Sequence, residues 1–106
     1  MGAPKKEIRI ATAGDPISHY TDGVLCGDLL FLSGQVGVDG ENNVVGIGDP
    51  AAQSEQLHRN IKAILEAAGM GFENIVNFEA FLPNVDDRPQ INPARQKYFG
   101  GFRPAS

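Results

Sequence analysis

One helix, marked at both of its ends, constrains the fold of this chain more than any other feature. Asp49 fits the N-cap and Pro50 the first helical position, which are the places that these residue types favour. Gly69 fits the left-handed cap that ends many helices. Between these signals, the apolar side chains share one face: Leu57, Ile61, Ile64, Leu65 and Ala68. The spacing therefore predicts an amphipathic helix over 50–68.

The other face of this helix is expected to meet solvent. It carries Gln53, Glu55, Arg59, Lys62 and Glu66. Glu55 and Arg59 are four residues apart, which suits an ion pair along the helix. His58 stands beside these polar residues, and we assign it no special role.

A strand and a hairpin are predicted ahead of the helix. Residues 7–12 alternate charged and apolar side chains, the pattern of a half-buried strand. Residues 13–23 are rich in turn-forming types and are expected to form a loop. Two apolar runs, 24–26 and 29–32, flank a Gly-Asp pair. This arrangement predicts a tight hairpin in which Gly27 takes the positive φ of a type II′ turn.

Further signals lie on either side of the long helix. The second hairpin strand is expected to continue through 33–36. The glycine-rich stretch 37–48 is expected to be a loop with a short strand at 44–45. After the helix, residues 75–82 place Val76, Phe78, Ala80 and Leu82 on one face of a predicted strand.

A second helix is predicted between Asp87 and Phe99, and Pro93 leaves its start open. Either Asn92 caps a short helix with Pro93 at its first position, or a longer helix is distorted at the proline. The order of elements is then β-β-β-α-β-α, an α+β chain. With 106 residues and no internal repeat or linker, one domain over 1–106 is expected.

Composition excludes several classes of function. A net charge of −4 argues against nucleic-acid binding through a basic surface. One cysteine, Cys26, forms no internal disulfide, which favours a reducing, cytoplasmic location. No stretch approaches the ~20 apolar residues of a membrane-spanning helix. His19 and His58 stand apart, with no His/Cys cluster for a metal.

The stretch 46–51 imitates the glycine pattern G-x-G-x-x-A of dinucleotide-binding loops. That pattern needs a buried strand before it, within a βαβ unit. Only Val44 and Val45 precede it here, and Asp49 with Pro50 explains the turn as helix capping. No organic cofactor is expected.

Four segments of the chain together are similar to one known family. Residues 32–36 (Leu-Ser-Gly-Gln-Val) are similar to its strand motif, and residues 60–69 to its first-helix signature. Ile91-Asn92 followed by Tyr98-Phe99 resembles its second helix, and Arg103-Pro104-Ala105-Ser106 resembles the Pro-Ala segment that enters its next strand. On these residues the chain, from Ile8 onward, resembles the RidA/YjgF family, also described as endoribonuclease L-PSP.

The resemblance implies a mixed sheet with two helices packed on one face, the RidA/chorismate-mutase-like fold. It also implies a homotrimer with ligand clefts between subunits. The family's best-known activity hydrolyses 2-imino acids or enamines to 2-oxo acids and ammonia, without metal or organic cofactor. The family's last two strands are missing here, so we expect either a shortened version of a longer protein or an oligomer that compensates.

Two departures from the family's catalytic pattern bear on activity. Imine-hydrolysing members carry Pro-Ala-Arg, whose arginine grips the substrate carboxylate, and here the matching residue is Ser106. Arg103 is no simple replacement, because three residues along an extended strand it points to the opposite face. The chain also ends before the strand that bears the family's water-positioning glutamate. We therefore assign no catalytic residue from the sequence.

The resemblance implies a substrate-binding set of Tyr20, Ser33, Gly34, Asn92 and Ser106 in a cleft between subunits. Three of these residues have a simpler alternative reading. Tyr20 also fits a loop anchor, Ser33 a strand serine bonded to its neighbours, and Asn92 a helix N-cap. Gly34 would let backbone donors approach a ligand closely.

Three functions follow as alternatives. The first is hydrolysis of reactive imines or enamines, and the second is a non-catalytic trimer that binds a small 2-imino or 2-oxo carboxylate and senses it. The third is an endoribonuclease or translation inhibitor, which the acidic charge balance disfavours.

Overall fold

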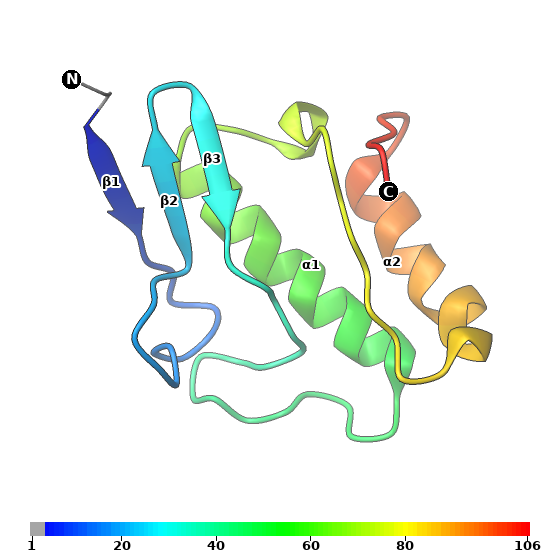
Figure 1. Ribbon diagram of the computed structural model, residues 1–106. Coiled ribbons are helices and arrows are strands. Elements are labelled where there is room, and N and C mark those ends of the chain that lie inside the picture. Colours follow the sequence, from blue (N-terminus) through cyan, green and yellow to red (C-terminus); the bar gives the residue numbers. More distant parts are fainter. Residues whose placement is uncertain (1–3) are drawn as a thin grey trace.

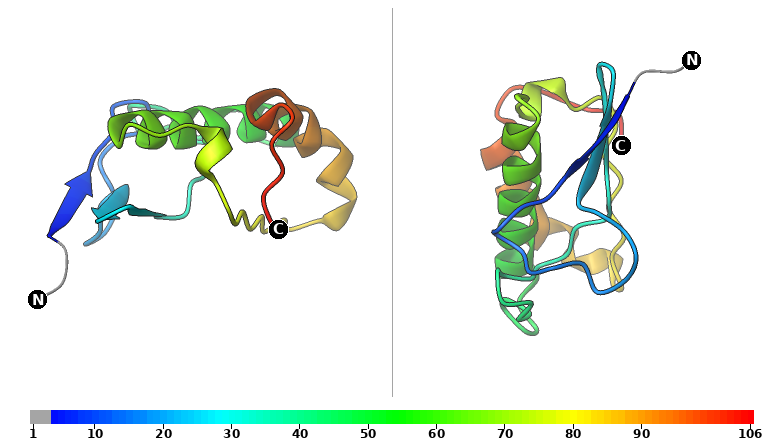
Figure 2. Two further views of the ribbon diagram at one scale, coloured as in Figure 1. Left: turned by 90° about the horizontal axis from the view of Figure 1, so that it is seen from above. Right: turned by 90° about the vertical axis from the view of Figure 1, so that its left-hand side faces the viewer.

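The computed structural model describes residues 4–106, so the first three positions of the expected domain 1–106 lie outside the described residues. Its elements follow the order β1 (Lys5–Ile8), β2 (Gly23–Cys26), β3 (Leu29–Leu32), α1 (Pro50–Ala67), the 3₁₀ helices η1 (Phe72–Asn74) and η2 (Val85–Asp87), and α2 (Arg88–Phe99) (Figure 1). The two helices form one layer, with the three strands and the extended segments on the other side (Figure 2). The α+β class and the placement of both helices on one face are confirmed.

The three strands form an antiparallel sheet in the order β1-β2-β3. Gly27 has a φ of +59° at the hairpin turn, while the residue after it keeps a negative φ. A positive φ at only the first central residue is the type II′ pattern, so the predicted turn is confirmed. Leu30 and Leu32 pack against the core, whereas Leu29 and Phe31 lie on the outer face, 64% and 61% exposed.

Two strand boundaries predicted from the sequence are wrong. β1 covers Lys5–Ile8 rather than 7–12. At Ile10, the backbone amide forms its hydrogen bond with a side chain and not with a neighbouring strand. The Ile10 amide donates to the carboxylate of Asp22 at 2.9 Å. β3 ends at Leu32 and does not continue through 33–36, since the Ser33 amide donates to the carbonyl of Asp22.

Helix α1 begins and ends where the sequence predicts. The Asp49 carboxylate accepts from the Ala52 amide at 3.2 Å, and Pro50 is the first helical residue. At the other end Gly69 has a φ of +73°, the left-handed conformation that glycine adopts at least cost. Both caps are local signals, and both are confirmed.

The predicted polar face of α1 reaches solvent, with Arg59, Lys62 and Glu66 exposed. Four other polar side chains of this helix are buried: Ser54, Gln56, His58 and Asn60. Asn60 is fully buried, and its amide donates to the carbonyls of Val38 at 3.1 Å and Val36 at 3.4 Å. It also accepts from the side chain of Gln56 at 3.0 Å. Loops cover this side of the helix, and the amides satisfy the loop carbonyls that would otherwise be buried without partners.

His58 is also buried, 3% exposed, which overturns its placement beside solvent. Its ring stacks between aromatic residues, with centroids 5.6 Å from both Phe78 and Tyr98. Nδ1 lies 2.7 Å from the Ser54 carbonyl, so the neutral ring carries its proton there. Nε2 is buried without a hydrogen-bond partner, and a second proton on it would have no acceptor.

The hydrophobic core lies between α1 and the segments that follow it. Its buried members are Ile61, Leu65, Phe72 and Phe99. Phe72 and Phe99 meet edge to face at 4.9 Å between ring centroids, a favoured aromatic geometry. Within residues 4–106, no helix combines the length and the apolar character needed to cross a membrane.

The strand predicted over 75–82 is not a regular strand. This segment runs extended beside α2 and makes one isolated parallel bridge, between Asn77 and Ala105. The amide of Phe78 donates to the Ala105 carbonyl at 2.8 Å, and the Ala105 amide donates to the Val76 carbonyl at 3.0 Å. A strand needs a hydrogen-bonded neighbour along its length, and this segment has one only at that bridge. The short strand expected at 44–45 is likewise one bridge, between Val38 and Val44.

Of the two alternatives for the second helix, the longer one is correct. Helix α2 covers Arg88–Phe99 with Pro93 inside it. Asn92 is therefore an internal residue of the helix and does not cap it. Since proline has no amide proton, one helical hydrogen bond is missing at this point.

Replacing Asn60 by alanine is expected to lower the free energy of unfolding by about 1–3 kcal/mol, because buried carbonyls lose their donor. Urea denaturation at fixed protein concentration measures the loss. Asn43→Ala is the matched control, since Asn43 is exposed and only its backbone, not its side chain, makes hydrogen bonds in the structure. Equal stabilities for the two variants would contradict the role of Asn60.

Stability is expected to fall as the pH drops below 6.5. Burial lowers the pKa of His58 from its ordinary value of 6.5, so the unfolded chain takes up a proton before the folded chain does. A state that binds more protons is favoured as the pH falls, hence unfolding becomes easier in that window. Urea midpoints at pH 7.5, 6.5 and 5.5 measure the slope. His58→Phe should flatten it, whereas His19→Gln, at an exposed position, should keep it; a steep slope in both variants would refute the assignment.

Candidate functional site

An open hollow of about 770 Å³ lies between the extended segment after η1, helix α2 and the end of the described chain. Its lining is Glu79, Ala80, Phe81, Leu82, Val85, Arg88, Ile91, Asn92, Arg95 and Ser106. Two of the residues predicted for the site, Asn92 and Ser106, therefore line the same space. They come from positions 14 apart in the sequence, and the turn at Gly100 after α2 brings the chain back towards Asn92.

Helix α2 supplies a stripe of side chains to this hollow. Arg88, Asn92, Arg95 and Phe99 follow one another at spacings of 4, 3 and 4 residues, which places them on one helical face. Phe99, at one end of the stripe, is 3% exposed in the core. The first three members line the hollow instead. The buried end of the stripe thus fixes the direction in which its open end points.

Arg95 is the most constrained polar side chain of the hollow. Its Nη1 donates to the Ser106 hydroxyl at 3.2 Å. The guanidinium carbon lies 4.9 Å from the centre of the Phe78 ring and 5.7 Å from that of Phe99. Both distances lie within the range of cation–π attraction. Sequence reasoning missed Arg88 and Arg95, because their common face with Asn92 depends on α2 continuing through Pro93.

The charge of this hollow is opposite in sign to that of the whole chain. Two arginines against one glutamate, Glu79, give the side chains of its lining a balance of +1, whereas the side chains of the whole chain sum to −4. Glu79 makes no ion pair with either arginine among the described residues. A small anion is therefore attracted here, although an anionic polymer would meet an acidic surface elsewhere.

The other three predicted site residues lie outside the lining of this hollow. The Ser33 hydroxyl donates to the carbonyl of Thr21, so the reading of a serine bonded to its neighbours describes it within one chain. Tyr20 is 49% exposed in the loop before β2. Gly34 is exposed, with no atom within 4 Å of the position that a Cβ would take. Their convergence with Asn92 and Ser106 needs a second subunit and stays a prediction.

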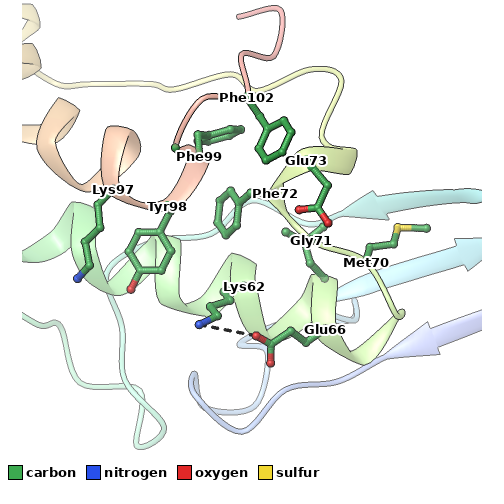
Figure 3. A pocket seen from close by; sticks show the side chains of 12 residues that line it. Lys62, Glu66, Met70, Gly71, Phe72, Glu73, Lys97, Tyr98, Phe99 and Phe102 are labelled. Atoms are coloured by element: carbon green, nitrogen blue, oxygen red, sulfur yellow. Dashed lines mark ion pairs between the residues drawn. The ribbon is translucent and has the colours of Figure 1, made fainter.

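A second hollow, of about 370 Å³, opens near the C-terminal ends of α1 and α2 (Figure 3). Among the described residues, three of its four charged side chains are in ion pairs, and Glu73 is the exception. Lys62 lies 3.8 Å from Glu66, and Lys97 lies 2.8 Å from Glu55. No predicted site residue lines it, so the hollow beside Asn92 is the better candidate.

Glu55 joins the two helices and does not belong to either hollow. One of its oxygens accepts from Lys97 and from the Tyr98 hydroxyl, at 2.8 and 2.9 Å. The hydrogen bond from Lys97 is the main cause of the lowered pKa of Glu55. Burial, with the bond to Glu55, raises the pKa of Tyr98. This predicted partner of Arg59 thus pairs instead with α2, and it holds the two helices together.

Metal ligands do not gather in the part of the chain that the structure describes. Among residues 4–106, no group of three His, Cys, Asp or Glu side chains lies close enough to hold an ion. Asp49, in the glycine-containing stretch 46–51, accepts the Ala52 amide and serves as a helix cap.

The fold and this hollow define a class of protein, the small α+β proteins with the RidA fold. RidA from an Antarctic Psychrobacter species has a structure that matches with a TM-score of 0.86 at 31% identity, covering 94% of this chain and 80% of that one. The sequence matches the family model described as Endoribonuclease L-PSP over residues 10–106. The chain therefore belongs to this family, which includes the RidA and YjgF proteins.

Two sequence relatives support the same assignment. A RutC family protein of Pyrococcus horikoshii is 34% identical over 101 residues, which cover 95% of this chain and 80% of the relative. A protein of Dermatophagoides farinae named 2-iminobutanoate/2-iminopropanoate deaminase is 32% identical over 103 residues, covering 97% and 80%.

Gly34→Ala is expected to change the free energy of unfolding by less than about 0.5 kcal/mol in the dissociated chain, because the new methyl group meets nothing there. Gly23→Ala is the contrasting variant. Its methyl group would lie 3.0 Å from Ile64 and 3.3 Å from the Phe31 carbonyl, an overpacked position that costs about 1–3 kcal/mol. Urea denaturation of both variants at the same low protein concentration compares the two. A large loss for Gly34→Ala would show that the chain's own packing requires this glycine.

Proposed function

We propose that this protein binds a small 2-oxo or 2-imino carboxylate in clefts between the subunits of a homotrimer. The observation that carries the proposal is the hollow that presents Asn92, Ser106 and two arginines together, with a positive balance. Tyr20, Ser33 and Gly34 of a neighbouring subunit would complete the cleft. The single cysteine, which cannot form an internal disulfide, favours a cytoplasmic location.

Association with further copies is supported by the outer face of β3. Leu29 and Phe31 are 64% and 61% exposed there, and Val36 beyond the strand is 62% exposed. Apolar side chains gathered at one surface mark a site of association. Gly34 lies between them in the sequence and leaves room for a neighbour's backbone.

A second candidate function is hydrolysis of the bound imine, and the relative named as an iminobutanoate deaminase favours it. In this reaction water adds to the C=N carbon, the carbon–nitrogen bond breaks, and a 2-oxo acid and ammonia are released. The hollow would hold the substrate by hydrogen bonds that persist as charge develops during the attack. The hydroxyl of Ser106 carries no positive charge, so we propose binding first and hydrolysis second.

Titration with 2-oxobutanoate is expected to give saturable binding, measured by calorimetry on a species of three times the 11.3 kDa chain mass. Asn92→Ala should weaken this binding about two- to tenfold, since one neutral hydrogen bond is lost. Asn43→Ala is the control at a distant, exposed position. A monomeric mass, or equal affinity in both variants, would refute the proposed cleft.

The same samples decide between binding and hydrolysis. An amino-acid oxidase generates the imine, and semicarbazide traps whatever remains unhydrolysed. If less imine reaches the semicarbazide trap when the protein is present, hydrolysis is established. An unchanged amount of trapped imine, together with saturable binding, would leave the binding function alone.

A further inference from the structure

Arg95 has a charge that the chain itself does not match. Among the described residues, the cations of the ion pairs are Arg9, Lys62 and Lys97. Arg95 makes no ion pair, and its side chain makes one hydrogen bond, to the neutral hydroxyl of Ser106. A guanidinium has five N–H donors in a planar fork, so most of this fork has no acceptor in the protein.

The side chain is nevertheless held in place. Arg95 is half-buried, and its guanidinium lies against the rings of Phe78 and Phe99 at 4.9 and 5.7 Å. These rings remove water from one side of the group, and cation–π attraction offsets part of that loss. The charge of Arg95 also affects the core: burial is the main cause of the lowered pKa of His58, and the nearby charge of Arg95 lowers this pKa further. A positioned arginine without an anionic partner is suited to receive one.

A simpler reading makes Arg95 only an anchor between α2 and Phe78. An anchoring role explains the contacts with the two rings. It does not explain why other polar side chains line the hollow beside the guanidinium N–H groups. Asn92, three residues earlier on the helix, presents an amide to the same hollow, and Arg88 lies one further turn away. Glu79 lines the hollow but makes no ion pair with Arg95. Donors therefore converge on an open space.

We propose that Arg95 is the carboxylate-binding residue of this protein. The two oxygens of a ligand carboxylate would accept from its fork, the arrangement that makes arginine–carboxylate pairs strong. The Ser106 hydroxyl, which accepts from Nη1, would orient the guanidinium. This inference rests on the proposed function, namely that a small carboxylate enters this hollow. It removes the difficulty posed by a serine at position 106, since the cation is supplied by α2 instead.

The test compares Arg95→Gln with Arg103→Gln, which makes the same charge change at an exposed position outside the hollow. Calorimetric titration with 2-oxobutanoate should show affinity about ten- to a hundredfold weaker for Arg95→Gln. Arg103→Gln should bind as the unmodified chain does. Arg95→Lys, which keeps the charge without the fork, should fall between. Adding Ser106→Arg to Arg95→Gln should recover most of the affinity.

A measurement on the unmodified chain guards against a variant that fails to fold. Phenylglyoxal modifies accessible arginines, and peptide mapping by mass spectrometry locates the products. Saturating 2-oxobutanoate should protect Arg95 several-fold and leave Arg103 unprotected. Equal modification of Arg95 with and without the ligand would overturn the inference.

Parallel titrations with butanoate separate the two proposals. If 2-oxobutanoate binds and Arg95→Gln does not weaken it, the role of Arg95 is refuted while the proposed function stands. If both acids bind equally and both need Arg95, the carboxylate site stands while the 2-oxo or 2-imino preference is refuted. If neither acid binds, both proposals are refuted.

Discussion

The structure depends on the burial of α1 on more than one side. Its apolar face packs into the core through Ile61 and Leu65, while Asn60 gives hydrogen bonds to loop carbonyls on another side. His58 stacks among the rings that reach it from α2 and the extended segment. A helix enclosed in this way fixes its neighbours as well as itself. The position of α2, and with it the hollow, follows from those contacts.

Structural features that depend on a few neighbouring residues could be predicted from the sequence. Features that depend on partners far away in the sequence could not. The cap at Asp49 and the turn at Gly27 depend on a few neighbouring residues, so both were predictable. Burial of Asn60 depends on carbonyls more than 20 residues away. The spacing of apolar residues along the helix does not indicate such distant partners. The strand over 75–82 had the right alternation, but regular pairing needs a neighbour that the alternation does not specify. Asn92 and Ser106, which only the family resemblance grouped, line the same hollow.

Arg95 illustrates why a site can escape a reading of the sequence even when its residues are conspicuous. Its face is shared with Asn92 only if the helix passes through Pro93, which proline disfavours in isolation. Tertiary contacts offset the missing hydrogen bond here, since Phe99 at the far end of the same stripe is buried. Packing of one aromatic ring therefore decides the direction of a charged group one turn earlier.

The charge pattern points to the size of the partner as well as its sign. An anion small enough to enter the hollow meets a local balance of +1, whereas a long polyanion must also approach a chain of charge −4. Coulomb interactions between exposed groups are screened beyond about 10 Å in ordinary salt, so the small ligand is governed mainly by the hollow and the polymer by the whole surface. The residues that we propose to bind a carboxylate thus give no corresponding advantage to RNA. The electrostatics of this chain favour a metabolite.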